Sequence, residues 1–273
     1  MKRPESHLRI VNPMGVRAFV SFVFVAAISL LGTEALAGPP FATDDPEPTG
    51  YRQWEIYLAG LYSNDGATVS GTLPQLEINY GPLPNVQIAG SFNCGLTGVP
   101  EHATHVGWGD NEFGLKLRFV QENSTRPQVA FYPSVTLAGN NQASHDAYVR
   151  TFLPVWLQKT WGQWTVYGGT GRWINPGAGN LNWWFSGLTV EREVSDRLVV
   201  GGEIFHGTPD TVGASSTTGF NIGMIAAARG PHRILFSIGR ALHGTNSLSA
   251  YGAYKFELGP QPSASPPTSQ TQR

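Results

Sequence analysis

The chain has 273 residues, a formal net charge of −1, 14% charged residues, 33 glycines and 8 tryptophans. The balanced charge argues against a nucleic-acid partner, which would need a concentrated basic face, and the mean hydropathy of −0.16 argues against a helical membrane protein. Cys94 is the only cysteine, which excludes an intrachain disulfide and a cysteine-built metal site, and we expect it to be an apolar residue at a strand end.

Residues 1–37 have the pattern of a secretory signal peptide. A basic start is followed by an apolar run at 18–31, and Ala35-Leu36-Ala37 forms a small-residue cleavage site. The apolar run is shorter than the ~20 residues that a membrane-spanning helix needs. We therefore expect an exported chain that loses this segment, rather than one that keeps it as an anchor.

Residues 38–50, with the sequence GPPFATDDPEPTG, are rich in proline and acidic side chains. We expect this segment to form a periplasmic arm or a small plug. As a plug it would gate a lumen, and Asp44, Asp45 and Glu47 are the candidate gate residues. The alternatives are that these acids bind a cation or are simply solvated.

The alternation of residue types in 111–122, NEFGLKLRFVQE, predicts a strand with one apolar face and one polar face. The apolar face would carry Phe113, Leu115, Leu117 and Phe119. The opposite face would carry Glu112, Lys116, Arg118 and Glu122. A helix, with 3.6 residues per turn, would mix the two sets.

The same period recurs along the chain and predicts twelve strands. They lie near 52–63, 72–81, 85–93, 110–121, 127–138, 148–160, 163–174, 182–194, 197–207, 217–228, 232–242 and 247–258. Most are near the ~9–11 residues that a tilted strand needs to cross a bilayer, and closure of an antiparallel bacterial barrel expects an even number. We predict an all-β protein, a single antiparallel transmembrane β-barrel of about twelve strands over residues 51–259.

The predicted connections alternate between short and long. The short ones, at 81–84, 122–126, 161–162, 195–196 and 229–231, would be periplasmic turns. The longer ones, at 64–71, 93–109, 139–147, 175–181, 207–216 and 243–246, would be outer loops. This rhythm is typical of outer-membrane barrels and puts both termini in the periplasm. A secreted β-sandwich would explain the alternation of residues, but not this rhythm.

Tryptophans gather near the predicted strand ends. Trp161 and Trp164 flank a predicted periplasmic turn, and Trp173, Trp183 and Trp184 flank a predicted outer loop. Because indole rings favour the membrane–water interface, the two groups indicate two aromatic girdles. After the last strand, residues 260–273 are rich in Pro, Ser and Gln, and we expect a disordered tail.

Charged residues on the polar faces of the strands are the main candidate site. Strand parity predicts that the lumen is lined by Glu55, Glu77, Glu112, Lys116, Arg118, Glu191 and Glu203. Charges within a membrane span usually line a cavity or pair across it. They would either set the selectivity of a pore or fill the barrel with salt bridges, and a path through twelve strands should be narrow.

Other polar clusters give weaker signals. The glycines at 168–171 and 177–179 resemble a phosphate loop only in composition, because a strand follows them where a phosphate loop needs a helix. We expect them to permit bending or close approach. His102, His105 and His145, with Asp110 and Asp146 nearby, are more typical of solvated loops than of a metal site. We predict no metal and no cofactor.

Two histidines are candidate catalytic residues of a membrane-embedded hydrolase. His206 and His243 end predicted strands near the outer rim, and the nearby serines are Ser215, Ser216 and Ser247. A hydrolase needs a serine within hydrogen-bond reach of a histidine that a third group orients. None of these serines has a recognisable nucleophile context, so we predict that the protein is not an enzyme.

Two stretches of sequence resemble a known family. The first is PFATDDPEP at 40–48, which leads into YRQWE at 51–55. The second is FLPVWLQK at 152–159, followed by WINPGAGN at 173–180 and NWWF at 182–185. The chain after the signal segment resembles the outer-membrane family named after the meta-pathway of phenol degradation, whose members are labelled transporters or porin-like barrels. The resemblance implies passage of small molecules, aromatic or apolar ones among them.

Together, these observations predict an outer-membrane, porin-like transporter for passive passage of small apolar or aromatic solutes. The chain would reach the outer membrane through the secretory pathway. Its partners would be the lipid bilayer and the solutes, with no nucleic acid and no particular oligomeric state predicted. The main alternative is a closed structural or interaction barrel whose outer loops carry the function.

Overall fold

The computed structural model describes residues 39–98, 105–139, 148–245 and 247–260. The predicted signal peptide, His102, His145, Asp146 and nearly all of the predicted tail lie outside these ranges. Every regular element in the described residues is a strand. No helix in these ranges is long and apolar enough to cross a membrane.

Fourteen strands follow one another along the described chain. They are β1 (Trp54–Asn64), β2 (Val69–Leu83), β3 (Val86–Gly98), β4 (His105–Trp108), β5 (Asn111–Val120), β6 (Gln128–Phe131), β7 (Ser134–Leu137), β8 (Arg150–Trp161), β9 (Trp164–Ile174), β10 (Trp183–Ser195), β11 (Leu198–Gly207), β12 (Thr217–Ala227), β13 (His232–His243) and β14 (Leu248–Leu258). β4 and β5 both pair with β3, and β6 and β7 both lie between β5 and β8. The fourteen pieces therefore form twelve barrel strands.

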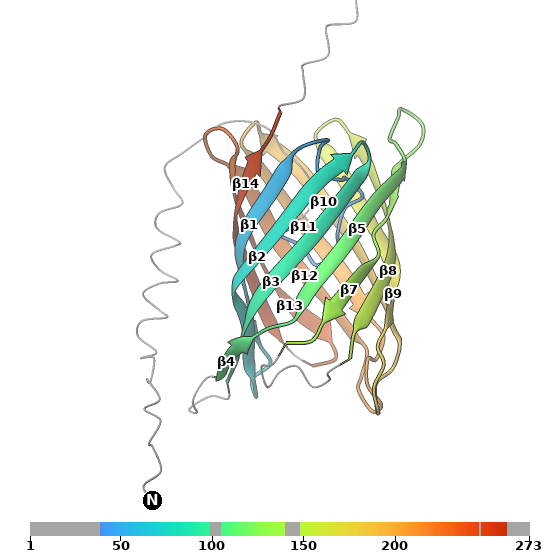
Figure 1. The fold of residues 1–273 in the computed structure, drawn as a ribbon, viewed down its shortest axis with the longest axis vertical. Coiled ribbons are helices and arrows are strands. Elements are labelled where there is room, and N and C mark those ends of the chain that lie inside the picture. The colour runs from blue at the N-terminus through green and yellow to red at the C-terminus, as the bar shows by residue number, and fades with distance from the viewer. Residues whose placement is uncertain (1–38, 99–104, 140–147, 246, 261–273) are drawn as a thin grey trace, which may run out of the picture.

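The sheet closes on itself. β1 pairs with β14 over its whole length, from Trp54↔Leu258 to Asn64↔Leu248, and all neighbouring strands run antiparallel. Figure 1 shows the tilted strands of the resulting cylinder. The predicted all-β fold, a single antiparallel barrel of about twelve strands, is confirmed.

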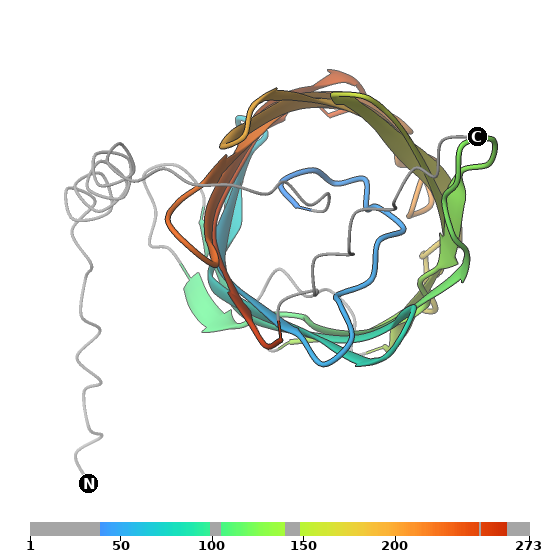
Figure 2. The ribbon, with the colours of Figure 1, turned by 90° about the horizontal axis from the view of Figure 1, so that it is seen from above.

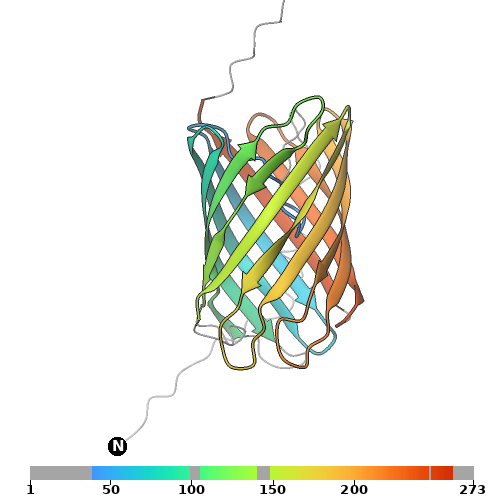
Figure 3. The ribbon, with the colours of Figure 1, turned by 90° about the vertical axis from the view of Figure 1, so that its right-hand side faces the viewer.

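The connections give the barrel two unlike ends, which Figure 3 shows from the side. At the end where β1 begins and β14 ends, here called the terminal end, β8 and β9 are joined by residues 162–163 alone. Gly162 has a φ of 59°, which suits a two-residue hairpin turn. At the opposite loop end, β9 and β10 are joined by 175–182 and β11 and β12 by 208–216.

Two predicted strand boundaries are corrected. The predicted strand 127–138 is split into β6 and β7 because Pro133 has no N–H to donate to a neighbouring strand. The predicted loop 93–109 is shorter than expected, because β3 continues to Gly98 and pairs with β4. Glycines interrupt the alternation of apolar and polar residues in this hairpin, so the sequence does not predict the hairpin. Cys94 lies within β3 and is half-buried.

Apolar side chains cover the outside of the barrel, whereas its interior contains buried charged side chains as well as apolar ones. On the outer face, Leu58 is 56% exposed, Phe119 64% and Ile222 58%. Inside, buried residues include Lys116, Glu191, Glu203, Arg233 and Lys255. A soluble β-sandwich would place these two classes the other way round. The apolar outer surface therefore needs lipid around it, which excludes the secreted sandwich.

Candidate functional site

The strand register brings predicted lumen residues from different strands into one row. Tyr57 lies opposite Glu77, Glu77 opposite Ser91, and Ser91 opposite Glu112. On its other side Tyr57 lies opposite Lys255. Directly opposed residues point to the same face of a sheet, so the row lines the lumen.

The seven charged residues predicted to line the lumen divide between two walls. Glu55, Glu77, Glu112 and Lys116 border a cavity on the side of β1, β2 and β5. Arg118, also on β5, reaches the N-terminal segment. Glu191 and Glu203 lie buried on β10 and β11, across the barrel, and the Tyr167 hydroxyl donates a hydrogen bond to Glu191.

Residues 39–50, called the arm below, lie inside the barrel. Figure 2 shows the arm within the ring of strands, entering the wall where β1 begins. Thr43, Asp45 and Thr49 are buried there. The sequence left open whether this segment is a periplasmic arm or a plug. In the structure it lies in the lumen.

Glu203 holds the start of the arm. Its carboxylate oxygens accept hydrogen bonds from the backbone N–H groups of Ala42 and Thr43, at 2.8 and 2.9 Å. On β13, the Ser237 hydroxyl donates to the carbonyl of Pro40 at 2.6 Å. Hydrogen bonds from consecutive N–H groups to a single carboxylate are charge-assisted and fix the backbone as well as the side chain.

Two cations on β5 hold the acidic middle of the arm. Lys116 Nζ lies 3.2 Å from Asp44 Oδ1 and 3.8 Å from Asp45 Oδ1. Arg118 Nη1 lies 2.6 Å from Glu47 Oε1. Burial raises the pKa of the Asp45 carboxyl well above its ordinary value, while the Lys116 ammonium acts in the opposite direction. Each of the three acids predicted to act as a gate therefore forms an ion pair with a cation of the barrel wall.

Glycines in the wall make room for the arm. A Cβ on Gly187 of β10 would overlap the side chain of Thr43, and a Cβ on Gly201 or Gly223 would lie 3.1 Å from the ring of Phe41. At the end of the arm, Thr49 N and Oγ1 donate to Gln87 Oε1 at 2.7 and 3.0 Å. The wall and the arm therefore fit each other closely along both sides of the lumen.

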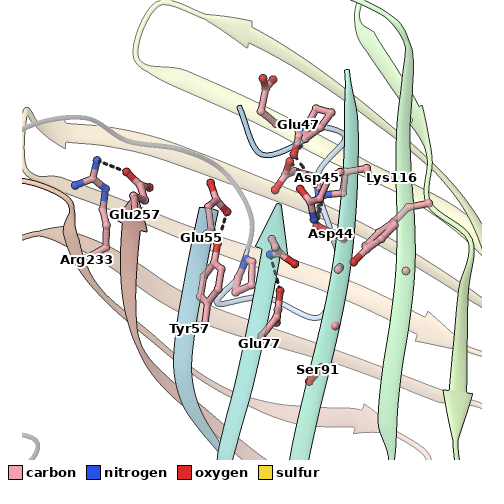
Figure 4. Close-up of a pocket in the computed structure, with 18 of the residues that line it drawn as sticks. Asp44, Asp45, Glu47, Glu55, Tyr57, Glu77, Ser91, Lys116, Arg233 and Glu257 are labelled. Carbon is pink, nitrogen blue, oxygen red and sulfur yellow. Dashed lines mark hydrogen bonds and ion pairs between the residues drawn. The ribbon is translucent and has the colours of Figure 1, made fainter. Parts of the chain in front are cut away.

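Beside the arm runs a cavity of about 850 Å³ (Figure 4). Its lining extends from Leu258 and Gly259 at the terminal end to Leu61 and Asn93, deeper in the barrel. The wall side includes Tyr57, Glu77 and Ser91, and arm residues close the other side. The cavity therefore follows the docked arm into the barrel.

An ion-pair network lies at the terminal end of this cavity. Lys255 Nζ lies 3.0 Å from Glu55 Oε1 and 2.9 Å from Glu257 Oε1. Arg233 Nη2 lies 3.8 Å from Glu257 Oε2. The Tyr57 hydroxyl donates to Glu55 at 3.0 Å. Predicted lumen residue Glu55 is thus part of a balanced group of two acids and two bases.

Aromatic rings line the opposite wall towards the loop end. This aromatic wall consists of Phe152, Trp156, Trp173, Trp183, Phe185 and Phe205, from β8 to β11. Ring centres of Phe152 and Trp173 lie 4.6 Å apart, and those of Trp173 and Trp183 lie 5.6 Å apart, in stacked arrangements. Their sequence neighbours on the outer face, such as Leu153 and Trp184, are exposed.

Glycines on neighbouring strands lie beneath these rings. The ring of Phe152 takes the space that a Cβ on Gly171 would need, and Trp156 does the same at Gly169. The rings of Phe152 and Trp156 therefore lie against the barrel wall rather than across the lumen, and Trp156, at 1% exposed, is covered by its neighbours. The predicted outer girdle is wrong for Trp173 and Trp183, which face inwards because they share strand parity with Phe152 and Phe185.

The hydrolase that the sequence left open would use His206 or His243. His206 Nδ1 lies 2.8 Å from the hydroxyl of Thr218, and within the described ranges no serine hydroxyl is hydrogen-bonded to His206 or His243. The described part of the chain also contains no group of three or more His, Cys, Asp or Glu side chains placed to hold a metal ion. His105, one of the loop histidines, lies at the start of β4.

Several solved structures share this architecture. An outer membrane channel from Pseudomonas putida F1 matches with a TM-score of 0.66 at 13% identity, covering 82% of this chain and 100% of that chain. The translocator domain of autotransporter NalP from Neisseria meningitidis matches with a TM-score of 0.53 at 12% identity, covering 89% and 96%. The KdgM porin, in complex with disordered oligogalacturonate, matches with a TM-score of 0.52 at 7% identity, covering 75% and 99%.

The fold is that of an outer-membrane β-barrel. This architecture, with its apolar outer surface, confirms the predicted location in the bacterial outer membrane. At these identities the likeness concerns the fold alone. No protein-family model and no curated protein matches the chain.

Proposed function

We propose that this barrel is a porin-like channel through which small solutes pass passively. The observation that carries the proposal is the cavity of about 850 Å³ that runs beside the arm, inside a closed barrel. The alternative, a closed structural barrel, predicts an interior filled by side chains, as in barrels of about eight strands. Passage needs no cofactor and no catalytic group, and we propose no enzymatic activity.

The aromatic wall supports small aromatic or apolar solutes as the class that passes. Stacked rings such as Phe152 and Trp173 offer flat apolar surfaces to a solute entering from the loop end. The sequence resemblance to the family named after the meta-pathway of phenol degradation points the same way. In this proposal the loop end faces the cell exterior and the terminal end faces the periplasm.

The arm would control how wide the path is. Beyond the peptide chain that continues from it into β1, the arm is held by polar contacts to Glu203, Lys116 and Arg118 rather than by strand pairing. Such contacts can be exchanged for contacts with water when both partners become solvated together, although hydrogen bonds to charged groups contribute about 1.5–3 kcal/mol each. The arm is therefore proposed as a gate, with Asp44, Asp45 and Glu47 as its attachment points.

Solute flux into proteoliposomes tests this function. Purified protein would be reconstituted, and uptake of phenol, an aliphatic alcohol and a monosaccharide compared with that of protein-free liposomes. The proposal predicts uptake above the protein-free level, with phenol preferred. If no solute enters faster than into empty liposomes, while heat-modifiable migration on gels shows a folded barrel, the closed structural barrel becomes the better account.

A further inference from the structure

One stretch of the cavity wall carries charges that the chain does not balance. β2, β3 and β5 place Glu77, Ser91 and Glu112 directly opposite one another in the inward-facing row. Because neighbouring strands lie about 4.8 Å apart, the two carboxylates flank the serine. Figure 4 shows Glu77 and Ser91 on adjacent strands, below the arm.

Neither carboxylate forms an ion pair with any described residue. The cations nearest in the register are bound elsewhere, since Lys116 pairs with Asp44 and Asp45, and Arg150 pairs with Asp110. Both side chains are half-buried, and holding a carboxylate away from water without a counter-charge is costly. A positively charged ligand group would remove that cost at this stretch.

Asn79 gives a second observation that does not depend on charge. It lines the cavity and is 4% exposed, and its Nδ2 donates to Glu77 Oε1 at 2.9 Å. Its Oδ1 has no hydrogen-bond partner in the described chain. The same holds for Gln75 Oε1, because Gln75 Nε2 donates to Ser91. Asn79 Oδ1 and Gln75 Oε1 are both hydrogen-bond acceptors, so a ligand group that satisfies them must be a hydrogen-bond donor.

Aromatic rings complete the surroundings of this stretch. Tyr132 and Tyr251 line the same cavity. Lys116 Nζ lies 4.9 Å from the centre of the Tyr132 ring, so a cation of the chain already uses that ring. In the described chain no cation lies over Tyr251. Tyrosine rings attract organic cations as well as apolar groups.

We propose that Glu77, Glu112 and Asn79 form a subsite for a small organic ammonium cation. Its N–H groups would donate to the two carboxylates and to Asn79 Oδ1, and its hydrocarbon part would pack against Tyr251. The inference rests on the proposed channel function and narrows its solute class. An arylalkylammonium ion such as benzylammonium suits both halves of the lumen, since its ring fits the aromatic wall and its ammonium group fits this polar subsite.

Calorimetric titration of the full chain in detergent tests the subsite. The probes are benzylammonium, benzyl alcohol and benzoate, which differ mainly in charge. Benzylammonium should bind at least about tenfold more tightly than benzyl alcohol, because charged hydrogen bonds are stronger than neutral ones, and benzoate should not bind. Equal binding of the amine and the alcohol, or no binding of the amine, would overturn the proposal.

Variants locate the binding. Glu77→Gln and Glu112→Gln should each weaken benzylammonium binding, and the double variant should remove its advantage over benzyl alcohol. Asp196→Asn, in the exposed β10–β11 turn, removes a charge outside the cavity and should leave binding unchanged. An advantage that persists in the folded double variant contradicts the assignment. If that variant does not fold, the comparison of the three probes on the natural chain decides.

The two proposals fail separately. Binding in detergent requires no passage across a membrane, so the ammonium subsite can be refuted while solutes still flow into proteoliposomes. Flux of phenol without any preference for benzylammonium would keep the channel and discard the subsite. Benzylammonium binding without flux of any solute would leave the subsite standing as a site in a closed barrel, and would refute its role in passage.

Discussion

At the scale of single residues, Lys116 links the wall to the arm. It is 4% exposed, and it is the cation that faces both Asp44 and Asp45. Removing one partner of a buried ion pair costs more than the pair itself contributes, because the other charge stays buried without compensation. The arm acids can avoid that cost by leaving the lumen.

Lys116→Met should therefore release the arm. Breaking a buried pair in this way costs about 3–5 kcal/mol, so amide hydrogen exchange across residues 42–49 should become much faster than in the natural chain. Adding Asp44→Asn and Asp45→Asn removes the stranded charges and should restore much of the protection. Unchanged exchange in Lys116→Met would show that Glu203 and Gln87 suffice to hold the arm.

At the scale of strands, glycine positions decide where other groups can lie. On the inner faces of β10, β11 and β12, Gly187, Gly201 and Gly223 leave space that Thr43 and Phe41 of the arm occupy. On β9, Gly169 and Gly171 leave space for Trp156 and Phe152. The missing side chain of glycine thus leaves space for the arm in one part of the lumen, and in another it allows the aromatic rings to lie flat against the barrel wall.

Gly187→Val should displace the arm without altering any arm residue. Its Cβ would lie 3.0 Å from Thr43 Cβ and closer still to the hydroxyl. The arm should move rather than β10, because β10 is paired along its length with two strands. Solute flux should rise. Gly252→Val is the control, since a Cβ there meets nothing within 4 Å, and equal flux in both variants would refute the fit.

The aromatic wall predicts a difference between two adjacent tryptophans. Trp183 stacks on Trp173 inside the lumen, whereas Trp184 is exposed on the outer face. Trp183→Ala should slow phenol uptake into proteoliposomes roughly two- to tenfold, the range expected for one aromatic contact, with little effect on a monosaccharide. Trp184→Ala should leave the ratio of phenol to monosaccharide uptake unchanged, and a similar loss in both variants would contradict the assignment.

The alternation of apolar and polar residues predicts the strands well because one face of each strand contacts lipid and the other faces the lumen. The sequence of each strand therefore also indicates which of its side chains point inwards. It also assigned an inward face to Glu77, Glu112 and Lys116 from their own segments. Patterning could not show that Lys116 meets Asp44, since that contact joins residues 72 positions apart. Nearness to a loop does not predict the direction of Trp173 and Trp183, whereas their strand parity, shared with Phe152 and Phe185, predicts an inward face.

At the scale of the whole molecule, the barrel divides its lumen in two. Towards the terminal end lie the ion-pair network around Lys255 and the polar cavity, towards the loop end lies the aromatic wall, and the arm reaches from the first region to Gly187 beside the second. A solute crossing the barrel would meet apolar rings first and charged groups later. Because the wall is closed by β1 and β14, any path between the two halves passes beside the arm or replaces it.

Planar-bilayer conductance of the chain with and without residues 39–50 tests this account most directly. The cavity beside the docked arm predicts a small conductance for the full chain, and removal of the arm should raise it severalfold by opening the space that the arm fills. Heat-modifiable migration would confirm that both proteins are folded barrels. Equal conductance in the two folded proteins, or none in either, would contradict the claim that the lumen is a solute path governed by the arm.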